Sequence, residues 1–430
     1  MNVFRLTTLA VVGLTVAGSA TASGQVKTTL SPSNPFYAKS TLQYQAPDFR
    51  RIKDSDYQPA IEAGMREQIA EVNAIAGQKT APTFANTIVP LERSGALLTR
   101  ASKVFNAVTG ANTNDALQKI QEDLAPKLAE HNDAIYLNPQ LFQRVKSVYD
   151  RRASMHLTAE QKFLTELYYK NFVRAGAQLS ASDQTRLRAL NQEESKLTTD
   201  FGNRLLAATK AGALVLDKVS DLDGFSPAEI ATAADAAKQR GLTGKWVIPL
   251  QNTTQHPAQA ELKNRAVRER LFIASTTRAE HGDANDTRQI VRRLAQLRAE
   301  RAKLLGFPTY AAYALDNQMS KTPQNAEKLL TDLVPAATAR ARSEAAQMQA
   351  LIDKEGGNFK LAPWDWQYYS EQVRKAQYAL DESQLKPYFE LDNVLKNGVF
   401  YAANQLYGLT FKERKDIPVY QPDVRVFEVF

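Results

Sequence analysis

Apolar residues recur at three- and four-residue steps along most of this chain, which is the spacing of one face of an α-helix. The longest such pattern covers residues 183–210, and its stripe consists of Leu187, Leu190, Leu197, Phe201 and Leu205. We expect a long helix there that acts as a structural spine. The same spacing predicts shorter helices from Tyr57 onward, around Leu91, Leu97 and Leu98, and over 116–131, 139–152 and 159–175.

Residues that start or stop helices locate several helix ends in the second half of the chain. Ser226, followed by Pro227, is placed to cap one helix, and Asp286 is placed to cap another that Gly306 ends. Pro335 should break or kink a helix that opens at Pro323. The last apolar helical stripe, near residues 395–406, should close at Gly408.

Two short runs of β-type residues interrupt the helices. Residues 214–216 and 246–250 are apolar and lie between glycine and asparagine residues, so we expect a small sheet there. A third run at 424–430 is rich in valine and phenylalanine and has no turn signal after it. An exposed edge strand of this kind is a feature that proteins avoid, so we expect further protein to follow it.

Four aromatic rings fall within six positions at residues 364–369, a density that the chain reaches nowhere else. Trp364 and Tyr368 are four positions apart and should share one helical face, while Asp365 could cap the first turn. Under one interpretation, this stretch is the buried opening of a helix held between two helical layers. Under the other, Trp364, Asp365, Tyr368 and Tyr369 border a groove for an extended ligand.

Length and composition are those of a globular protein with more than one domain. The chain has 430 residues, of which 43% are hydrophobic and 23% charged. We place an extended lead-in at 23–55, an N-terminal helical domain at 56–212, and a second helical domain with the small sheet at 213–430. The net charge of +8 comes from basic residues interleaved with acidic ones, which argues against a nucleic-acid partner.

The first 22 residues have the composition of an export signal. One basic residue, Arg5, precedes an apolar run at 6–17, and Ala20 and Ala22 frame a small-residue cleavage site. We expect cleavage after Ala22 and a periplasmic or secreted product. The apolar run is short for a bilayer span and no later stretch matches it, so we expect no membrane partner. The chain has no cysteine, which removes disulfides and thiolate chemistry.

No catalytic constellation is visible in the sequence. The four histidines, which are His131, His156, His256 and His281, lie at least 25 residues apart, whereas two zinc ligands on a helix need a four-residue spacing. We expect each to be a solvated or hydrogen-bonded surface residue, and the carboxylates at 193–194 to form a solvated helix face. A nucleophile elbow and a phosphate loop are also absent from the sequence. We therefore assign no catalytic residue and no metal ligand to this chain.

The order of several short motifs nevertheless resembles the thimet oligopeptidase family of zinc metallopeptidases, and within it the peptidyl-dipeptidase branch. The motifs are Asn34-Pro35-Phe36, Pro82-Thr83-Phe84, Arg174-Ala175-Gly176-Ala177, residues 297–307, Pro363-Trp364-Asp365 with Tyr368-Tyr369, and Tyr388-Phe389. Together they cover nearly all of the chain after residue 34. Each motif is modest alone, and their order is specific.

The resemblance implies a mainly α, two-lobed fold whose halves flank a channel. It also implies an enzyme that releases dipeptides from the C-termini of short peptides by means of zinc. The His-Glu-x-x-His helix of that family has no counterpart here, so we expect a chain that lacks the catalytic part, binds no zinc and is inactive alone. A separately encoded C-terminal catalytic portion is then an expected partner. The alternative is a non-catalytic periplasmic protein that binds peptides or acts as a scaffold.

Overall fold

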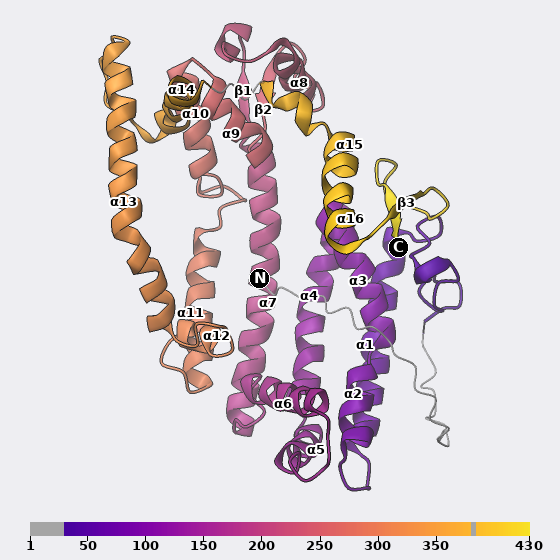
Figure 1. The fold of residues 1–430 in the computed structure, drawn as a ribbon. Helices are drawn as coiled ribbons and strands as arrows, with labels where there is room; N and C mark the ends of the chain where they lie inside the picture. The colour runs from indigo at the N-terminus through magenta and orange to yellow at the C-terminus, as the bar shows by residue number, and fades with distance from the viewer. Residues whose placement is uncertain (1–29, 380–383) are drawn as a thin grey trace.

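The computed structural model describes residues 30–379 and 384–430, so the expected signal sequence lies outside the described residues. In the first helical layer, α1 (Asp54–Ala76), α3 (Ala96–Ala111) and α4 (Asp115–Tyr136) run side by side (Figure 1). Their core contains Tyr57, Ile61, Phe105, Leu117 and Leu124. Ahead of them, the short 3₁₀ helix η1 (Gln43–Gln45) belongs to the lead-in.

The connection between α1 and α3 is divided more finely than the apolar pattern predicts. It contains a π-helix, η2 (Phe84–Ile88), and the short α2 (Val89–Arg93) before α3 begins. The expected single helix through Leu91 and Leu97 is therefore wrong. Gly95 has a φ of 72°, a left-handed conformation that ends one helix and lets the chain turn into the next.

A second core lies under α5 (Pro139–Asp150) and α6 (Ala159–Arg174). Phe172 and Val145 are fully buried there, and the rings of Phe142 and Phe172 stack at a centroid distance of 6.0 Å. These two helices agree closely with the predicted ranges.

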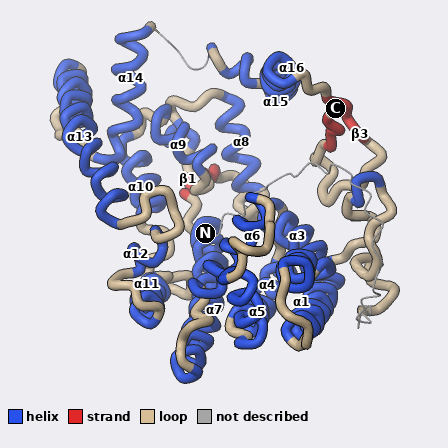
Figure 2. The backbone as a smooth tube through the Cα atoms, turned by 60° about the horizontal axis from the view of Figure 1, so that its bottom comes forward, coloured by secondary structure: helices blue, strands red, loops and turns tan. Residues whose placement is uncertain are grey.

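The predicted spine is α7 (Ala181–Ala211), which begins after Ser180, whose hydroxyl accepts the N–H of Asp183. Leu187 and Leu190 are buried, and the rest of the stripe is half-buried. Figures 1 and 2 both place α7 between α4 on one side and α11 (Arg288–Leu304) on the other. The long helix thus joins two parts of the fold that lie on opposite sides of it.

The predicted small sheet is present as β1 (Leu214–Leu216) and β2 (Trp246–Ile248), paired antiparallel with Leu214 opposite Ile248. Between them lie η3 (Val219–Leu222) and α8 (Pro227–Lys238), whose cap is Ser226, as predicted. The helices α9 (Asn252–Glu261) and α10 (Arg265–Thr276) complete this part. Its core is aliphatic and includes Leu216, Leu250, Leu262 and Leu271.

Two further helices follow α11, namely α12 (Tyr310–Leu315) and α13 (Pro323–Lys354). α13 continues through Pro335, so the break is wrong and its alternative, a kink, stays a prediction. Thr331, whose carbonyl would have bonded to an N–H at position 335, is exposed, and water can satisfy it. At its far end α13 buries Met348 and Ile352 against α14 (Trp366–Tyr378), which follows the 3₁₀ turn η4 (Pro363–Asp365).

The last described part contains η6 (Lys386–Phe389), α15 (Leu391–Asn393), the π-helix η7 (Val394–Phe400) and α16 (Tyr401–Tyr407). Gly408, with a φ of 71°, closes α16 as predicted. The strand expected at the end of the chain is β4 (Val426–Val429), which pairs antiparallel with β3 (Phe411–Arg414). Among the described residues, no helix combines the length and apolar character needed to cross a bilayer.

Candidate functional site

The aromatic stretch is organised around Asp365, whose side chain is fully buried where α10 meets η4 and α14. One carboxylate oxygen accepts from Arg265 Nε and Arg268 Nη2, both at 3.0 Å. The other accepts from Arg265 Nη2 at 2.9 Å and from the backbone N–H of Ala362 at 3.1 Å. A single carboxylate therefore ties two arginines of one helix to the start of another, and we call Arg265, Arg268 and Asp365 the Asp365 cluster.

The two arginines reach the same carboxylate because they are three positions apart on α10 and share a helical face. They differ in environment, since the Arg268 side chain is 2% exposed and that of Arg265 is 34% exposed. Arg268 also donates through Nη1 to the carbonyls of Leu262 and Lys263, at 2.8 and 3.0 Å. Most of its hydrogen-bonding capacity is thus used inside the protein, as a buried guanidinium requires.

Aromatic rings cover the two guanidinium groups. The Arg268 guanidinium lies 4.2 Å from the ring centroid of Tyr368, and that of Arg265 lies 4.3 Å from Phe359 and 5.4 Å from Trp364. Trp364 and Tyr368 therefore both face α10, as their four-residue spacing predicts. These cation–π contacts add to the ion pairs because the rings exclude water from them.

Tyr369 belongs to the core that α14 shares with α13. It is 7% exposed and packs with Met348 and Ile352, and burial raises the pKa of its hydroxyl. The indole Nε1 of Trp364 is buried without a hydrogen-bond partner. These contacts account for the aromatic density as packing between helices, while the groove interpretation stays a prediction.

The expected cap is present only in part. Asp365 accepts the backbone N–H of Ala362 at the start of η4, but it makes no cap hydrogen bond to α14, and its other partners are Arg265 and Arg268, 100 and 97 positions away. A local pattern contained the aspartate and the proline, but the two arginines could be associated with it only through the tertiary fold.

The four histidines are scattered in the structure as well. His131 is 6% exposed and its Nε2 lies 2.7 Å from Gln68 Oε1, so it is not the surface residue that we expected. Burial lowers its pKa. His156, His256 and His281 are exposed, as expected.

The carboxylates at 193 and 194 form ion pairs between helices, which corrects their expected role as a solvated face. Glu193 accepts from Arg293 at 2.6 and 2.7 Å, and Glu194 binds Arg298 and Arg301 of the same helix, α11. The Glu194 side chain is 14% exposed. The acidic residues of α7 are thus matched by the basic residues of α11, and the periodic charges hold two helices together.

This polar contact continues to α4. Arg301 also donates to Asn191 Oδ1, and Asn191 Nδ2 donates to Asp133 Oδ1 at 2.6 Å. Asp133 is 7% exposed and its second oxygen has no partner. Burial raises the pKa of this carboxyl to about 6, against the smaller opposing effects of Asn191, Arg188 and Arg301. We call Asp133, Asn191, Arg301 and Glu194 the three-helix relay.

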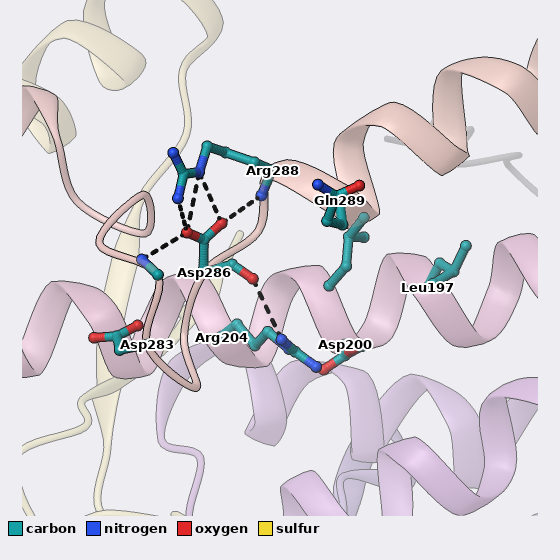
Figure 3. A pocket seen from close by; sticks show the side chains of 9 residues that line it. Leu197, Asp200, Arg204, Asp283, Asp286, Arg288 and Gln289 are labelled. Carbon is teal, nitrogen blue, oxygen red and sulfur yellow. Dashed lines mark hydrogen bonds and ion pairs between the residues drawn. The ribbon is translucent and has the colours of Figure 1, made fainter.

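A cavity of about 740 Å³ opens between α7 and the loop before α11, and Figure 3 shows its lining. Asp286 accepts the backbone N–H groups of Gly282 at 2.8 Å and Arg288 at 2.9 Å, together with the Arg288 guanidinium. Across the cavity, Arg204 pairs with Asp200 at 2.8 Å. Both arginines are paired with lining aspartates, and the third lining aspartate, Asp283, accepts only the backbone N–H of Asn285, so the lining offers no unpaired cation to an anionic ligand.

Asp286 also acts differently from the expected cap. It accepts the N–H of Arg288 in the first turn of α11, but the cap position belongs to Thr287, and Asp286 folds the 282–288 loop back on itself. Hydrogen bonds from the Arg288 side chain and backbone hold the pKa of the Asp286 carboxyl below its ordinary value. The carboxyl is therefore an ionised loop-closing group.

Comparison with known proteins adds to this geometry. Residues 258–430, which include the Asp365 cluster, match the model of peptidase family M3. A dipeptidyl carboxypeptidase of Escherichia coli is 52% identical over 401 residues, 93% of this chain, and one from Salmonella typhimurium is 52% identical over 398 residues. The chain belongs to peptidase family M3. Oligopeptidase A of Escherichia coli is a more distant relative, 28% identical over 391 residues.

The chain spans less than two thirds of the length of these M3 relatives. It covers 59% of the Escherichia coli dipeptidyl carboxypeptidase and 57% of the oligopeptidase A. In the family, zinc is the catalytic metal. Over residues 30–379 and 384–430, no three histidine, aspartate or glutamate side chains come together as its ligands would. The described residues of this M3 chain therefore do not fit a catalytic zinc ion.

Proposed function

We propose that this chain is part of a zinc metallopeptidase of the peptidyl-dipeptidase type, which hydrolyses short peptides and releases dipeptides from their C-termini. The observation that carries the proposal is the 52% identity to a dipeptidyl carboxypeptidase over 93% of the chain. An identity this high over so much of the chain is best explained by a shared role.

In this proposal the chain supplies framework and the zinc ligands come from a catalytic portion outside it. When bound, zinc acidifies a water molecule and polarises the scissile carbonyl. The chain's own contribution is to fix the positions of its helices, through the Asp365 cluster between α10 and α14 and the three-helix relay between α4, α7 and α11. Alone, the chain is expected to be inactive.

The test measures metal and turnover together. The purified chain is assayed for zinc content and for release of a dipeptide from an N-blocked tetrapeptide, with the Escherichia coli dipeptidyl carboxypeptidase as positive control. We expect substoichiometric zinc and no turnover by this chain alone. Stoichiometric zinc together with turnover would contradict the assignment of the catalytic groups to another portion.

Export is part of the same proposal, because residues 1–22 have the composition of an export signal. A periplasmic or secreted product would meet short peptides from outside the cytoplasm. Expression with the native leader in a Gram-negative host, followed by fractionation and N-terminal sequencing, should give a product that begins at Ser23. A full-length product retained in the cytoplasm would contradict the export proposal.

A second candidate is a non-catalytic periplasmic protein that binds peptides or acts as a scaffold. It is favoured by Trp364, which is only partly buried and whose ring lies 5.4 Å from the partly exposed Arg265 guanidinium. This candidate predicts that short peptides change the tryptophan fluorescence of the chain alone. A folded sample whose emission is indifferent to millimolar peptide would exclude it.

A further inference from the structure

Burial is distributed very unevenly along the chain. No residue between 303 and 347 is buried, and none between 384 and 430. The helices before residue 303 enclose well-filled cores, by contrast, with Phe172, Leu141 and Leu250 at 0 to 1% exposure. Both exposed stretches fall inside residues 258–430, the part that matches the M3 model.

The first exposed stretch contains a continuous apolar surface on α13, made of Leu329, Leu330, Leu333 and Val334. These side chains are 56 to 67% exposed. Leu330 and Val334 precede the buried Met348 and Ile352 by 18 residues each, which is five turns of an α-helix. They therefore lie on the same side of α13 as the residues that pack against α14. This α13 apolar face continues an existing interface beyond the point where α14 stops covering it.

The second exposed stretch carries aromatic and aliphatic side chains on η6, α15 and α16. Tyr388, Phe389, Leu391, Tyr401, Leu406 and Tyr407 are 61 to 75% exposed. We call these six residues the C-terminal apolar face. Large side chains in such number at this exposure are typical of an interaction surface and uncommon on the free surface of a monomer.

Both ends of this second stretch are anchored, so its exposure is not that of a loose tail. At one end Lys386 Nζ lies 2.8 Å from Glu229 Oε1 on α8. At the other, the ring of Tyr420 meets Phe49 of the lead-in at a centroid distance of 5.6 Å, and Tyr44 bonds to Glu428. The segment is thus held to the rest of the molecule at both ends (Figure 1), while its apolar side chains remain exposed.

We propose that the α13 apolar face and the C-terminal apolar face together dock the catalytic portion of the M3 peptidase. That portion corresponds to the part of the Escherichia coli dipeptidyl carboxypeptidase that this chain does not match. The occupant is chosen because both faces belong to the M3-matching region and because the relatives carry further protein that must pack somewhere. The inference rests on the proposed function for the existence of that portion, and adds where it binds.

The test joins this chain to that unmatched part of the Escherichia coli enzyme in one chimeric polypeptide. Hydroxyl-radical footprinting then compares side-chain oxidation in the chimera and in this chain alone. We expect Leu330, Phe389 and Tyr407 to be oxidised at least fivefold more slowly in the chimera. Phe163, which is 67% exposed on α6 outside both faces, is the matched control and should be oxidised equally in both.

A charged pair of substitutions probes the same surface. Leu330→Glu with Val334→Glu should lower the zinc occupancy and the peptidase rate of the chimera at least tenfold, while Phe163→Glu leaves both unchanged. In this chain alone, both variants should unfold at the wild-type temperature, because all three side chains are exposed.

The possible results distinguish a failure of the docking surface from a failure of the proposed function. Protection of both faces without hydrolysis supports the docking surface and counts against the proposed function. A folded, active chimera whose two faces are oxidised as in the chain alone overturns the docking surface. Light scattering that shows a dimer of this chain, dissolved by the charged pair, also overturns it, because a second copy is then the occupant. If the chimera does not fold, this chain and the unmatched part of the Escherichia coli enzyme are co-expressed as two polypeptides, and their failure to associate counts against the docking surface as well.

Discussion

The single negative charge of Asp365 is paired with two guanidinium groups, and all of its hydrogen bonds are made inside the protein. Transferring a charge away from water is costly unless it is paired and hydrogen-bonded. Arg268 meets that condition only because Asp365 is present, since its other partners are neutral carbonyls. The stability of the contact between α10 and α14 therefore depends strongly on one carboxylate.

Replacing Asp365 with Asn should destabilise the fold by about 3 kcal/mol, because a buried arginine loses its counter-charge while the shape of the side chain is kept. Urea unfolding followed by circular dichroism measures the change. The matched control is Asp332→Asn, which removes an exposed pair with Lys328 and should cost less than about 0.5 kcal/mol. Equal losses in the two variants would show that the Asp365 ion pairs are not stabilising.

The roles of single residues were predictable where both interacting partners are close in the sequence. Ser226 caps α8 and Gly408 ends α16 because each interaction spans a few positions. The true partners of Asp365 and Glu194 were missed, because about 100 residues separate each from its arginines. The partners of Glu194 could have been predicted from the run of arginines in α11, because these basic residues match the glutamates of α7.

At the scale of elements, α1 and α3 approach closely because residue 64 has no side chain. A Cβ built on Gly64 would lie 2.5 Å from the backbone nitrogen of Leu98, a distance that no side-chain rotation can relieve. Gly202, in the interior of α7, has no such neighbour within 4 Å. The two glycines share a helical setting and differ in what surrounds them.

Gly64→Ala should therefore destabilise the protein by about 1–3 kcal/mol through overpacking. Gly202→Ala should stabilise it by about 0.5–1 kcal/mol, because alanine favours the helix and nothing obstructs its methyl group. Thermal unfolding of the two variants beside the wild type gives both signs in one experiment. A stabilising Gly64→Ala would mean that α1 and α3 are farther apart than described.

Helical periodicity predicted where the helices lie, but it did not predict which of their apolar faces are packed against other elements. The stripe of α7 and the ranges of α5 and α6 follow from apolar spacing, and so does the stripe near the end of the chain. The pattern states that one face is apolar, but not what packs on it, so Leu330 and Leu406 were not distinguishable from core residues. The short strands were predictable because glycine and asparagine residues enclose them.

At the scale of the whole molecule, the three-helix relay connects the parts on either side of α7, and its response to pH can be stated. The folded-state pKa of Asp133 is raised to about 6, above the ordinary value of 3.8. The folded state therefore binds the proton of the Asp133 carboxyl more tightly than the unfolded state does. The stabilisation that comes from this difference is complete below the ordinary pKa and is lost as the pH rises through 6.

Asp133→Asn removes that titration while an amide oxygen can still accept the bond from Asn191. The variant should be more stable than wild type at pH 8, by up to about 3 kcal/mol, and the difference should vanish near pH 4. Denaturant unfolding at several pH values between 4 and 8 measures it. Arg188, Arg301 and Glu130, which also influence Asp133, are unchanged in the variant. A constant difference across this range would refute the raised pKa.

The geometry of α7 limits how this protein can change over evolutionary time. One helix presents Ser195 and Asn203 to α4, and Glu193 and Glu194 to α11. Each residue of a helix turns the direction of its side chain by about 100°. Loss or gain of a single codon in the middle of α7 would rotate every later side chain by that angle, and one of the two flanking helices would lose its matching surface. We therefore expect insertions and deletions in homologues to fall in the loops and to leave the length of α7 constant.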